Sequence, residues 1–217
     1  YRIFTDATAD MNADMLAGIP EIEIIPMEVN FGEESFTFGP GGNLSVAQFY
    51  AMQREGRFAN TSQINPEIYR ECFERALRRG EDVLYLCFSS GMSGTIDNAR
   101  ISVEALQKAY PEREIIVLDT LCASVGEGFL TREAARKQAE GLDLHALRDW
   151  VMESRLKVCH WFTVDTFTHL KHGGRVSGAV AAIGSVLNIK PLLHVDEAGK
   201  LDVAQKPRGR KQALKAQ

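Results

Sequence analysis

The chain has no hydrophobic run long enough to cross a membrane, and it carries little excess charge. Its 25 basic and 29 acidic residues give a formal net charge of −4, which does not favour binding to nucleic acid or to an anionic membrane surface. Cysteine is scarce, and none of the four cysteines forms a C-x-x-C pair. We therefore expect four buried free thiols in a cytoplasmic protein, without disulfides and without zinc.

The hydrophobic pattern of the chain changes near residue 156. Short apolar segments alternate with stretches of helical periodicity as far as residue 156, which predicts an α/β fold with a parallel sheet between helices. After that point the pattern changes to short strand-like segments and glycine-rich loops. With 217 residues available, we expect a parallel α/β/α domain over residues 1–156 and a smaller α/β domain over residues 157–217.

The most informative segment is an apolar strand followed by a loop of small residues. Val83–Phe88 is apolar, Ser89–Thr95 is serine- and glycine-rich, and helical periodicity begins at Ile96. A Ser/Gly loop that leads into a helix N-terminus forms a cluster of N–H and O–H donors, which binds anions. The loop lacks the lysine of a phosphate-binding loop, so a single carboxylate suits it better than a triphosphate. Alternatively, Ser93 or Thr95 only caps the helix.

A second hydroxyl-bearing loop, Thr61–Gln63, precedes a helix that begins near Pro66. Loops at the carboxyl ends of parallel strands gather in one crevice, so we expect this loop and Ser89–Thr95 to lie together. Two hydroxyls from separate loops can hold both oxygens of a carboxylate. A cap or turn role for Thr61 and Ser62 is the alternative.

Catalytic and metal-binding motifs are weaker. Gly91–Thr95 resembles the G-x-S-x-G elbow of serine hydrolases, but Thr95 stands where the last glycine belongs and no triad partners are evident. His169 and His172 lack a third ligand, so we expect no metal site. Arg175 is either a surface cation or an anion contact.

Two groups of charged residues have ordinary explanations. Asp6, Asp10 and Asp119 follow predicted strands, where aspartate can hold magnesium or cap a turn. Basic residues are frequent in Gly209–Gln217, but apolar residues interrupt them, which predicts an amphipathic helix start rather than a nucleic-acid-binding tail. Because that helix is cut off without a cap, we expect the second domain to be incomplete at its C-terminal end.

Six motifs occur in order along the chain: Thr5–Asp10, Thr61–Gln63, Ser89–Thr95, Asp119–Thr120 with Ser124–Gly128, Leu170–Ser177 and Leu187–Leu193. Together they resemble the DegV family of bacterial fatty-acid-binding proteins, which includes the acyl-binding subunit of fatty acid kinase. The resemblance extends over essentially the whole chain. Three residues depart from the usual pattern without removing a hydroxyl: Ile64 replaces proline, Met92 replaces leucine and His172 replaces arginine or lysine.

The resemblance implies both a fold and a ligand. The fold is a parallel α/β domain followed by an α/β domain with a mixed sheet, and a long-chain fatty acid is buried between them without any further cofactor. In the family, the threonine of T-S-Q and the last serine of S-S-G-x-S-G hold the carboxylate, and here these residues are Thr61 and Ser93. The two loops favour the same donors on physical grounds, with the Gly94 N–H as a third. Family members are usually longer than this chain.

The resulting prediction is a lipid carrier with no catalysis of its own. It takes a fatty acid from a membrane by transient contact, buries the tail, and presents the carboxylate to a separate ATP-dependent kinase that forms an acyl phosphate. Arg175 or Arg208 meets the kinase or its phosphates. Two alternatives stay open: a lipid sensor or store without a kinase partner, and a hydrolase that uses Ser93.

Overall fold

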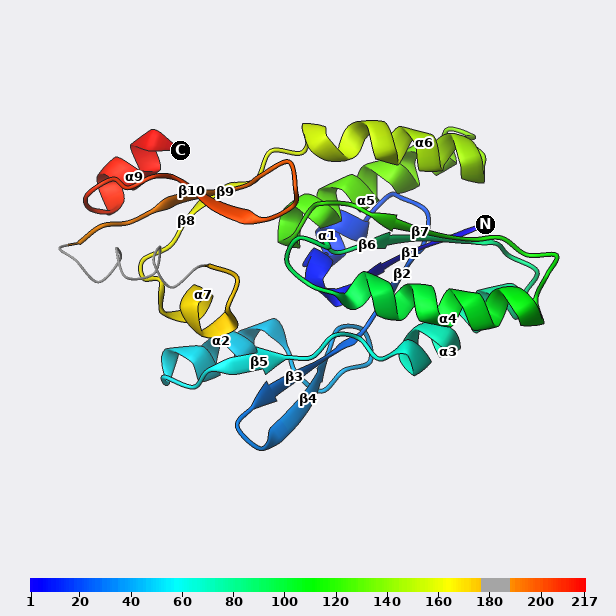
Figure 1. Ribbon diagram of the computed structural model, residues 1–217, viewed down its shortest axis with the longest axis horizontal. Coiled ribbons are helices and arrows are strands. Elements are labelled where there is room, and N and C mark those ends of the chain that lie inside the picture. Colours follow the sequence, from blue (N-terminus) through cyan, green and yellow to red (C-terminus); the bar gives the residue numbers. More distant parts are fainter. Residues whose placement is uncertain (177–187) are drawn as a thin grey trace.

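The computed structural model describes residues 1–176 and 188–217, which form three β-sheets with helices around them (Figure 1). One sheet is parallel and has four strands, and the other two are antiparallel and have three strands each. The predicted α/β fold with a parallel sheet is confirmed. The small residues Ala179–Gly184 have a pattern that predicts a further helix, and this segment lies outside the described residues.

The parallel sheet has the strand order β2-β1-β6-β7. Every residue of β6 is buried, as the apolar run predicted, and this strand pairs with both β1 and β7. The chain leaves β1 for β2 on one side, whereas β6 lies on the other side of β1. Ligands of such sheets bind beyond the carboxyl ends of the strands at this reversal. The strands are β1 (Arg2–Asp6), β2 (Ile22–Ile25), β6 (Val83–Cys87) and β7 (Ile115–Asp119).

Helices cover both faces of the parallel sheet (Figure 1). On one face, α3 and α4 bury a cluster in which the rings of Phe4 and Phe73 meet edge to face, with their centroids 5.2 Å apart. On the other face, α5 and α6 pack through Leu130 and Leu147. The helices of this part are α1 (Ala13–Leu16), α3 (Pro66–Arg78), α4 (Thr95–Ala109), α5 (Ser124–Ala139) and α6 (Leu144–Ser154), with the short 3-10 helices η1 (Ala7–Ala9) and η2 (Arg155–Lys157).

The second sheet, β4-β3-β5, carries one of the predicted hydroxyl loops. The hairpin of β3 (Met27–Phe31) and β4 (Glu34–Phe38) closes through Gly32, whose φ of 65° suits a two-residue turn. β5 (Ala59–Thr61) pairs antiparallel with β3. Thr61 therefore ends an antiparallel strand, which corrects the expectation that its loop follows a parallel one. α2 (Val46–Arg54) begins with a capping box at Ser45.

The third sheet has the order β10-β9-β8, and all of its described pairings are antiparallel. The resemblance had implied a mixed sheet here. The hairpin of β9 and β10 turns at Asp196–Lys200. The elements of this part are β8 (Trp161–Thr163), α7 (Thr168–Gly173), β9 (Leu192–Val195), β10 (Leu201–Gln205) and α9 (Arg210–Ala216).

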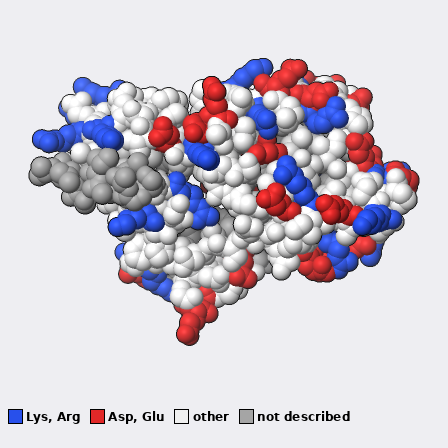
Figure 2. All heavy atoms as spheres, viewed as in Figure 1, with Lys and Arg blue, Asp and Glu red and all other residues white. Residues whose placement is uncertain are grey.

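The surface is chemically mixed. Figure 2 shows acidic and basic side chains interspersed over the part of this face that contains the parallel sheet and its helices. Cys72, Cys87 and Cys122 are buried and unpaired, but Cys159 is exposed, so the expectation of four buried thiols is wrong for Cys159. Among the helices of the described residues, none combines the length and the apolar character that a membrane span requires.

Candidate functional site

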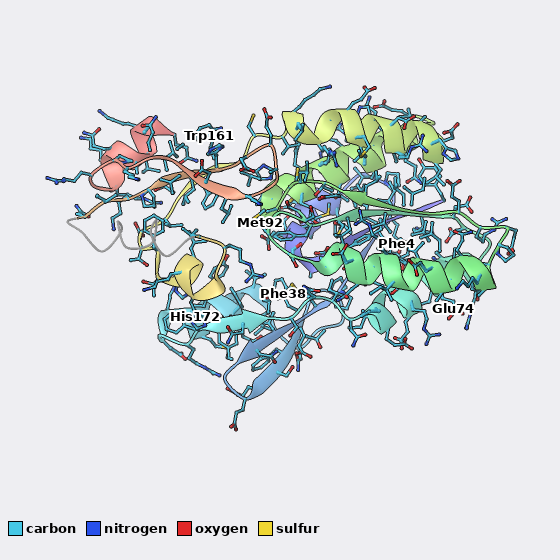
Figure 3. All side chains as sticks on the ribbon, in the orientation of Figure 1. Phe4, Phe38, Glu74, Met92, Trp161 and His172 are labelled. Carbon is cyan, nitrogen blue, oxygen red and sulfur yellow. The ribbon has the colours of Figure 1, made fainter. Side chains whose placement is uncertain are left out.

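A cavity of about 1310 Å³ lies beyond the carboxyl ends of β1 and β6, where the three sheets approach one another. In Figure 3, Trp161 and Phe38 lie on opposite sides of this space and Met92 lies at its inner end. The cavity exceeds the roughly 300–1,000 Å³ of ordinary small-molecule sites, and its wall is mostly apolar. The apolar lining includes Met27, Val29, Phe38, Val46, Phe49, Tyr50, Ile64, Phe88, Val125, Phe129, Trp161, Phe162, Leu170, Val195 and Leu201.

The first half of the Ser89–Thr95 loop contacts the third sheet rather than the cavity. Ser89 is fully buried, and its Oγ donates to the carbonyl oxygen of Gly199 at 2.7 Å. Gly91 lies against the same β9–β10 turn, and a Cβ on Gly91 would be 2.5 Å from the carbonyl oxygen of Ala198. Ser89 and Gly91 therefore join two sheets, a role that sequence reasoning did not assign to them.

The second half of the loop faces the cavity at the N-terminus of α4. Gly94 is the N-cap residue, and no side chain caps this helix end. Ser93 Oγ accepts a hydrogen bond from the Thr95 N–H at 3.3 Å. Among the described residues, neither the Ser93 hydroxyl proton nor the Gly94 N–H has an acceptor. Both donors are thus available, at a helix end that favours an anion.

Thr61 lines the same cavity. It is exposed at the end of β5, and its hydroxyl has no hydrogen-bond partner among the described residues. The side chain of Gln63 joins its loop to α4, because Gln63 Oε1 accepts from Asn98 Nδ2 at 3.2 Å. The Asn98 side chain also donates to the Ile64 carbonyl oxygen at 2.9 Å. Thr61, Ser93 and Gly94, the three predicted donors, therefore all line one cavity.

The two predicted arginines separate. Arg175 lines the cavity, and its Nε donates to the carbonyl oxygen of Met92, next to Ser93, at 3.3 Å. Arg208 does not line the cavity. It is exposed and forms an isolated β-bridge with Ile189. The structure thus brings only Arg175 to the predicted donors.

The side chains considered as metal ligands have other partners. Asp6 accepts from the Thr8 N–H, Asp119 accepts from the Ser90 and Leu121 N–H groups, and Asp10 accepts from the Ser124 hydroxyl. His172 stacks on Phe58 and contacts the Asn60 side chain, while His169 also lies against Phe58. Residues 1–176 and 188–217 contain no group of three or more metal-binding side chains.

A chain of buried hydroxyls reaches this site from the core, and sequence reasoning missed it. Tyr85 Oη donates to Asp6 Oδ2 at 2.6 Å, and Tyr69 Oη lies 3.0 Å from Tyr85 Oη. Tyr69 Oη also lies 2.8 Å from Thr95 Oγ1, which accepts from the Ile64 N–H at 3.3 Å. The available signal was a tyrosine in the middle of the apolar run Val83–Phe88, because a buried hydroxyl needs a partner.

Glu127 extends the chain of buried hydroxyls on the other side of Asp6. Thr8 Oγ1 donates to Asp6 Oδ1 and lies 3.1 Å from Glu127 Oε2. Complete burial and the nearby Asp6 carboxylate raise the pKa of Glu127 well above its ordinary value. The single proton of the Thr8 hydroxyl goes to Asp6, so a protonated Glu127 supplies the proton between Glu127 and Thr8.

His160 joins the third sheet to the N-terminus of α5. Its Nε2 accepts from the Ala123 N–H at 3.2 Å, and its Nδ1 lies 3.1 Å from the Val158 carbonyl oxygen. This arrangement requires a neutral ring protonated on Nδ1, and burial correspondingly lowers the pKa of His160. Gly126 leaves room for the ring, because a Cβ there would be 2.1 Å from His160 Nε2.

Comparison with known proteins agrees with this geometry. The protein-family model described as "Uncharacterised protein, DegV family" matches residues 1–216. The chain belongs to the DegV family. A DegV domain-containing protein of Clostridium perfringens is 39% identical over 215 residues, which cover 99% of this chain and 74% of the relative. The family resemblance predicted from the six motifs is thereby confirmed.

Solved structures of DegV proteins share the fold. A DegV family protein from Thermus thermophilus, whose structure is described as showing fatty acid binding, matches with a TM-score of 0.80 and 30% identity, over 99% of this chain and 75% of that one. The Fatty Acid Kinase (Fak) B3 protein of Streptococcus pneumoniae, loaded with linoleic acid, matches with a TM-score of 0.85 and the same coverage. At 19% identity, this second likeness concerns the fold alone.

Proposed function

We propose that this DegV protein binds one long-chain fatty acid and presents its carboxylate to a separate ATP-dependent kinase. The observation that carries the proposal is a set of three donors that line one cavity and have no acceptor among the described residues: the hydroxyls of Thr61 and Ser93 and the N–H of Gly94. All three are neutral, so together they suit one carboxylate group. The fatty acid binding described for the Thermus thermophilus relative supports the same ligand class.

The apolar lining supports a long tail. Each methylene group that moves from water into the cavity contributes about 0.8 kcal/mol, so tail burial supplies most of the binding free energy. Two hydrogen bonds to a charged carboxylate contribute about 1.5–3 kcal/mol each and set the position of the head group. The proposal keeps the two predicted domains, residues 1–156 and 157–217, with the ligand between them.

The carrier role follows from the chemistry of the bound head group. A carboxylate held by neutral donors keeps its negative charge and remains a nucleophile for the γ-phosphorus of ATP. Attack forms an acyl phosphate and releases ADP, and positioning is most of what such a transfer requires from the protein. In this proposal Arg175, at the cavity wall, contacts the kinase or its phosphates, while Arg208 is a candidate on the outer surface.

Loading by transient membrane contact has support at the cavity edge. Four apolar side chains that line the cavity are also at least half exposed to solvent: Val46, Tyr50, Val125 and Phe129. Exposed apolar groups next to a lipid cavity favour uptake of a fatty acid directly from a bilayer, because the tail then avoids water.

The two alternatives predict different behaviour. A hydrolase would need a base at Ser93, yet among the described residues the recorded partner of Ser93 Oγ is the Thr95 N–H, and no histidine contacts it. A serine-directed fluorophosphonate would label Ser93 in a hydrolase and leave a carrier unlabelled. A sensor or store would bind the lipid without supporting acyl phosphate formation by any fatty acid kinase.

Native mass spectrometry of the purified protein tests the proposal. We expect one long-chain fatty acid per chain, released and identified after organic extraction. Folded protein that neither copurifies with an acyl chain nor takes one up from fatty-acid-containing vesicles would falsify the proposal. With ATP, a fatty acid kinase and hydroxylamine, the loaded protein should yield an acyl hydroxamate, which separates the carrier from a sensor or store.

A further inference from the structure

The chain of buried hydroxyls ends at a single residue, Thr95, which contacts both ligand loops through two of its atoms. Thr95 Oγ1 accepts from the Ile64 N–H, three residues after Thr61, while the Thr95 N–H donates to Ser93 Oγ. Thr95 is only 5% exposed, and Tyr69, Tyr85 and Asp6 are completely buried. One continuous, buried hydrogen-bonded connection therefore links β1 to both loops.

The proton order of this chain is determined at its Asp6 end. The Asp6 carboxylate only accepts, so Tyr85 donates to it and the Tyr85 oxygen accepts from Tyr69. Tyr69 has then used its proton, so its oxygen accepts from the Thr95 hydroxyl. Every hydroxyl proton points toward Asp6, and the Thr95 hydroxyl is not available to a ligand.

These hydroxyls fix position rather than fill space. The rings of Tyr69 and Tyr85 pack against Phe73 with centroids 5.8 and 5.6 Å apart, so a phenylalanine at either position would occupy the same volume. Without its hydroxyl, however, Tyr69 could no longer accept a hydrogen bond from Thr95 Oγ1. The Thr95 side chain, which is also the partner of the Ile64 N–H, would then be free to rotate. Buried hydrogen-bond networks of this kind restrict a structure to one arrangement when every member is satisfied.

We propose that Tyr69, Tyr85 and Asp6 are positioning residues that set the spacing between Thr61 and Ser93 through Thr95, and with it the grip on the ligand carboxylate. The inference rests on the proposed function, because it assigns the carboxylate to those two hydroxyls. It predicts that removal of the Tyr69 or Tyr85 hydroxyl, which the ligand does not contact, weakens binding of the head group and leaves binding of the tail intact.

Tyr69→Phe tests this, with Tyr110→Phe as its matched control. Tyr110 ends α4 at the opposite end from the cavity, and its hydroxyl donates to Glu74 on α3 at 2.9 Å. Both variants therefore remove a tyrosine hydroxyl that ties α3 to α4, but only Tyr69 lies at the ligand end. Dissociation constants are measured for palmitate and for hexadecanol, which has the same tail length without a carboxylate.

We expect Tyr69→Phe to weaken palmitate binding about fivefold and hexadecanol binding less than twofold, while Tyr110→Phe changes neither ligand by more than twofold. The ¹³C resonance of carboxyl-labelled palmitate should shift in Tyr69→Phe and stay in place in Tyr110→Phe. If Tyr69→Phe does not fold, Tyr85→Phe, which breaks the next link toward Asp6, should give the same selective loss.

The outcomes separate the two proposals. Wild-type protein that binds neither ligand overturns the proposed function and this inference with it. Wild-type protein that binds palmitate, together with a folded Tyr69→Phe that binds it equally well, overturns only the inference. Equal weakening of palmitate and hexadecanol also overturns it, since that result reports a general loosening of the cavity.

Discussion

Ser93 Oγ accepts a hydrogen bond from the N–H of Thr95, the first residue of α4, and still keeps its own proton for a second partner. The sequence left open whether this serine caps a helix or binds a ligand. In the structure no side chain caps α4, but the Ser93 oxygen does contact its first N–H group. The contact with Thr95 uses the oxygen lone pair, whereas a carboxylate ligand would use the hydroxyl proton. The two roles can therefore be separated by measuring stability and ligand affinity on the same variant.

Ser93→Ala and Thr61→Ala should each weaken fatty acid binding by about 1.5–3 kcal/mol, or roughly 10- to 150-fold, because each removes one hydrogen bond to a charged group. The lipid remains bound through its tail, with its head displaced. Acyl phosphate formation should therefore fall more than lipid occupancy. Titration with a fatty acid and kinase-coupled turnover measure the two effects.

Ser45→Ala is the control that shows what the loss of a helix cap does to this protein. Ser45 caps α2 through a complete capping box and does not line the cavity. Its replacement should cost about 1 kcal/mol of stability without changing ligand affinity. If Ser93→Ala behaves as Ser45→Ala does, and the double variant of Ser93 and Thr61 retains full turnover, neither hydroxyl belongs to the site.

Glu127→Gln should remove a pH dependence of stability. Below the ordinary pKa of 4.5, Glu127 is protonated in both the folded and the unfolded chain, and its burial carries no ionisation penalty. As the pH rises above that value, the unfolded chain loses the proton while the folded chain keeps it, so the free energy of unfolding falls. Glutamine is neutral throughout and avoids this loss.

Urea unfolding of wild type and Glu127→Gln between pH 5 and 8 measures the difference. We expect the variant to gain on the wild type as the pH rises, by at most about 1.4 kcal/mol per pH unit. A difference that stays constant across this range would mean that Glu127 is ionised in the folded protein.

His160→Gln should alter the acid side of the stability profile. Burial lowers the pKa of His160 from its ordinary value of 6.5, so the folded protein favours the neutral ring. Its contribution is complete above pH 6.5 and is lost as the pH falls through the lowered pKa, because protonated Nε2 cannot accept from Ala123. Glutamine can accept through its oxygen at any pH. Between pH 7 and 5 the variant should lose less stability than the wild type, and parallel curves would contradict this role.

Gly91→Ala should lower stability by about 1–3 kcal/mol, because the added Cβ meets backbone that cannot move independently. The nearest atom is the Ala198 carbonyl oxygen, at 2.5 Å. Gly173→Ala is the matched control, since its Cβ would have only the Arg175 side chain nearby, at 4.0 Å. Thermal unfolding of both variants should show a lower midpoint for Gly91→Ala alone. Equal midpoints would contradict this prediction, because they would show that the β9–β10 turn can move to make room for the added methyl group.

The local hydrophobic pattern of the sequence predicted the strands whose own residues carry a clear apolar run. Within the apolar run Val83–Phe88, Val83–Cys87 is a strand in which every residue is buried. β5 was not evident because Ala59–Thr61 has only three residues and depends on pairing with β3. A segment that short carries no periodicity of its own, so its partner decides its conformation.

The sequence indicated those residues of the candidate site whose side chains have a single evident role. The hydroxyls of Thr61 and Ser93 stood out because they lie in small-residue loops beside a helix start, and both line the cavity. Tyr85 did not stand out, because a tyrosine in an apolar run is as suitable for packing as for hydrogen bonding. Its partners Asp6 and Tyr69 come from β1 and α3, and only the folded sheet brings the three together.

The bond from Ser89 Oγ to the Gly199 carbonyl oxygen also constrains the order of assembly during synthesis. The two residues are 110 positions apart, so the β9–β10 turn emerges from the ribosome long after the parallel sheet has all its strands. Until then, Ser89 and Gly91 have no hairpin to pack against. The loop that carries Ser93 then lacks its contacts with the β9–β10 turn. A nascent chain with a complete parallel sheet should therefore bind fatty acid only after residue 199 has left the exit tunnel.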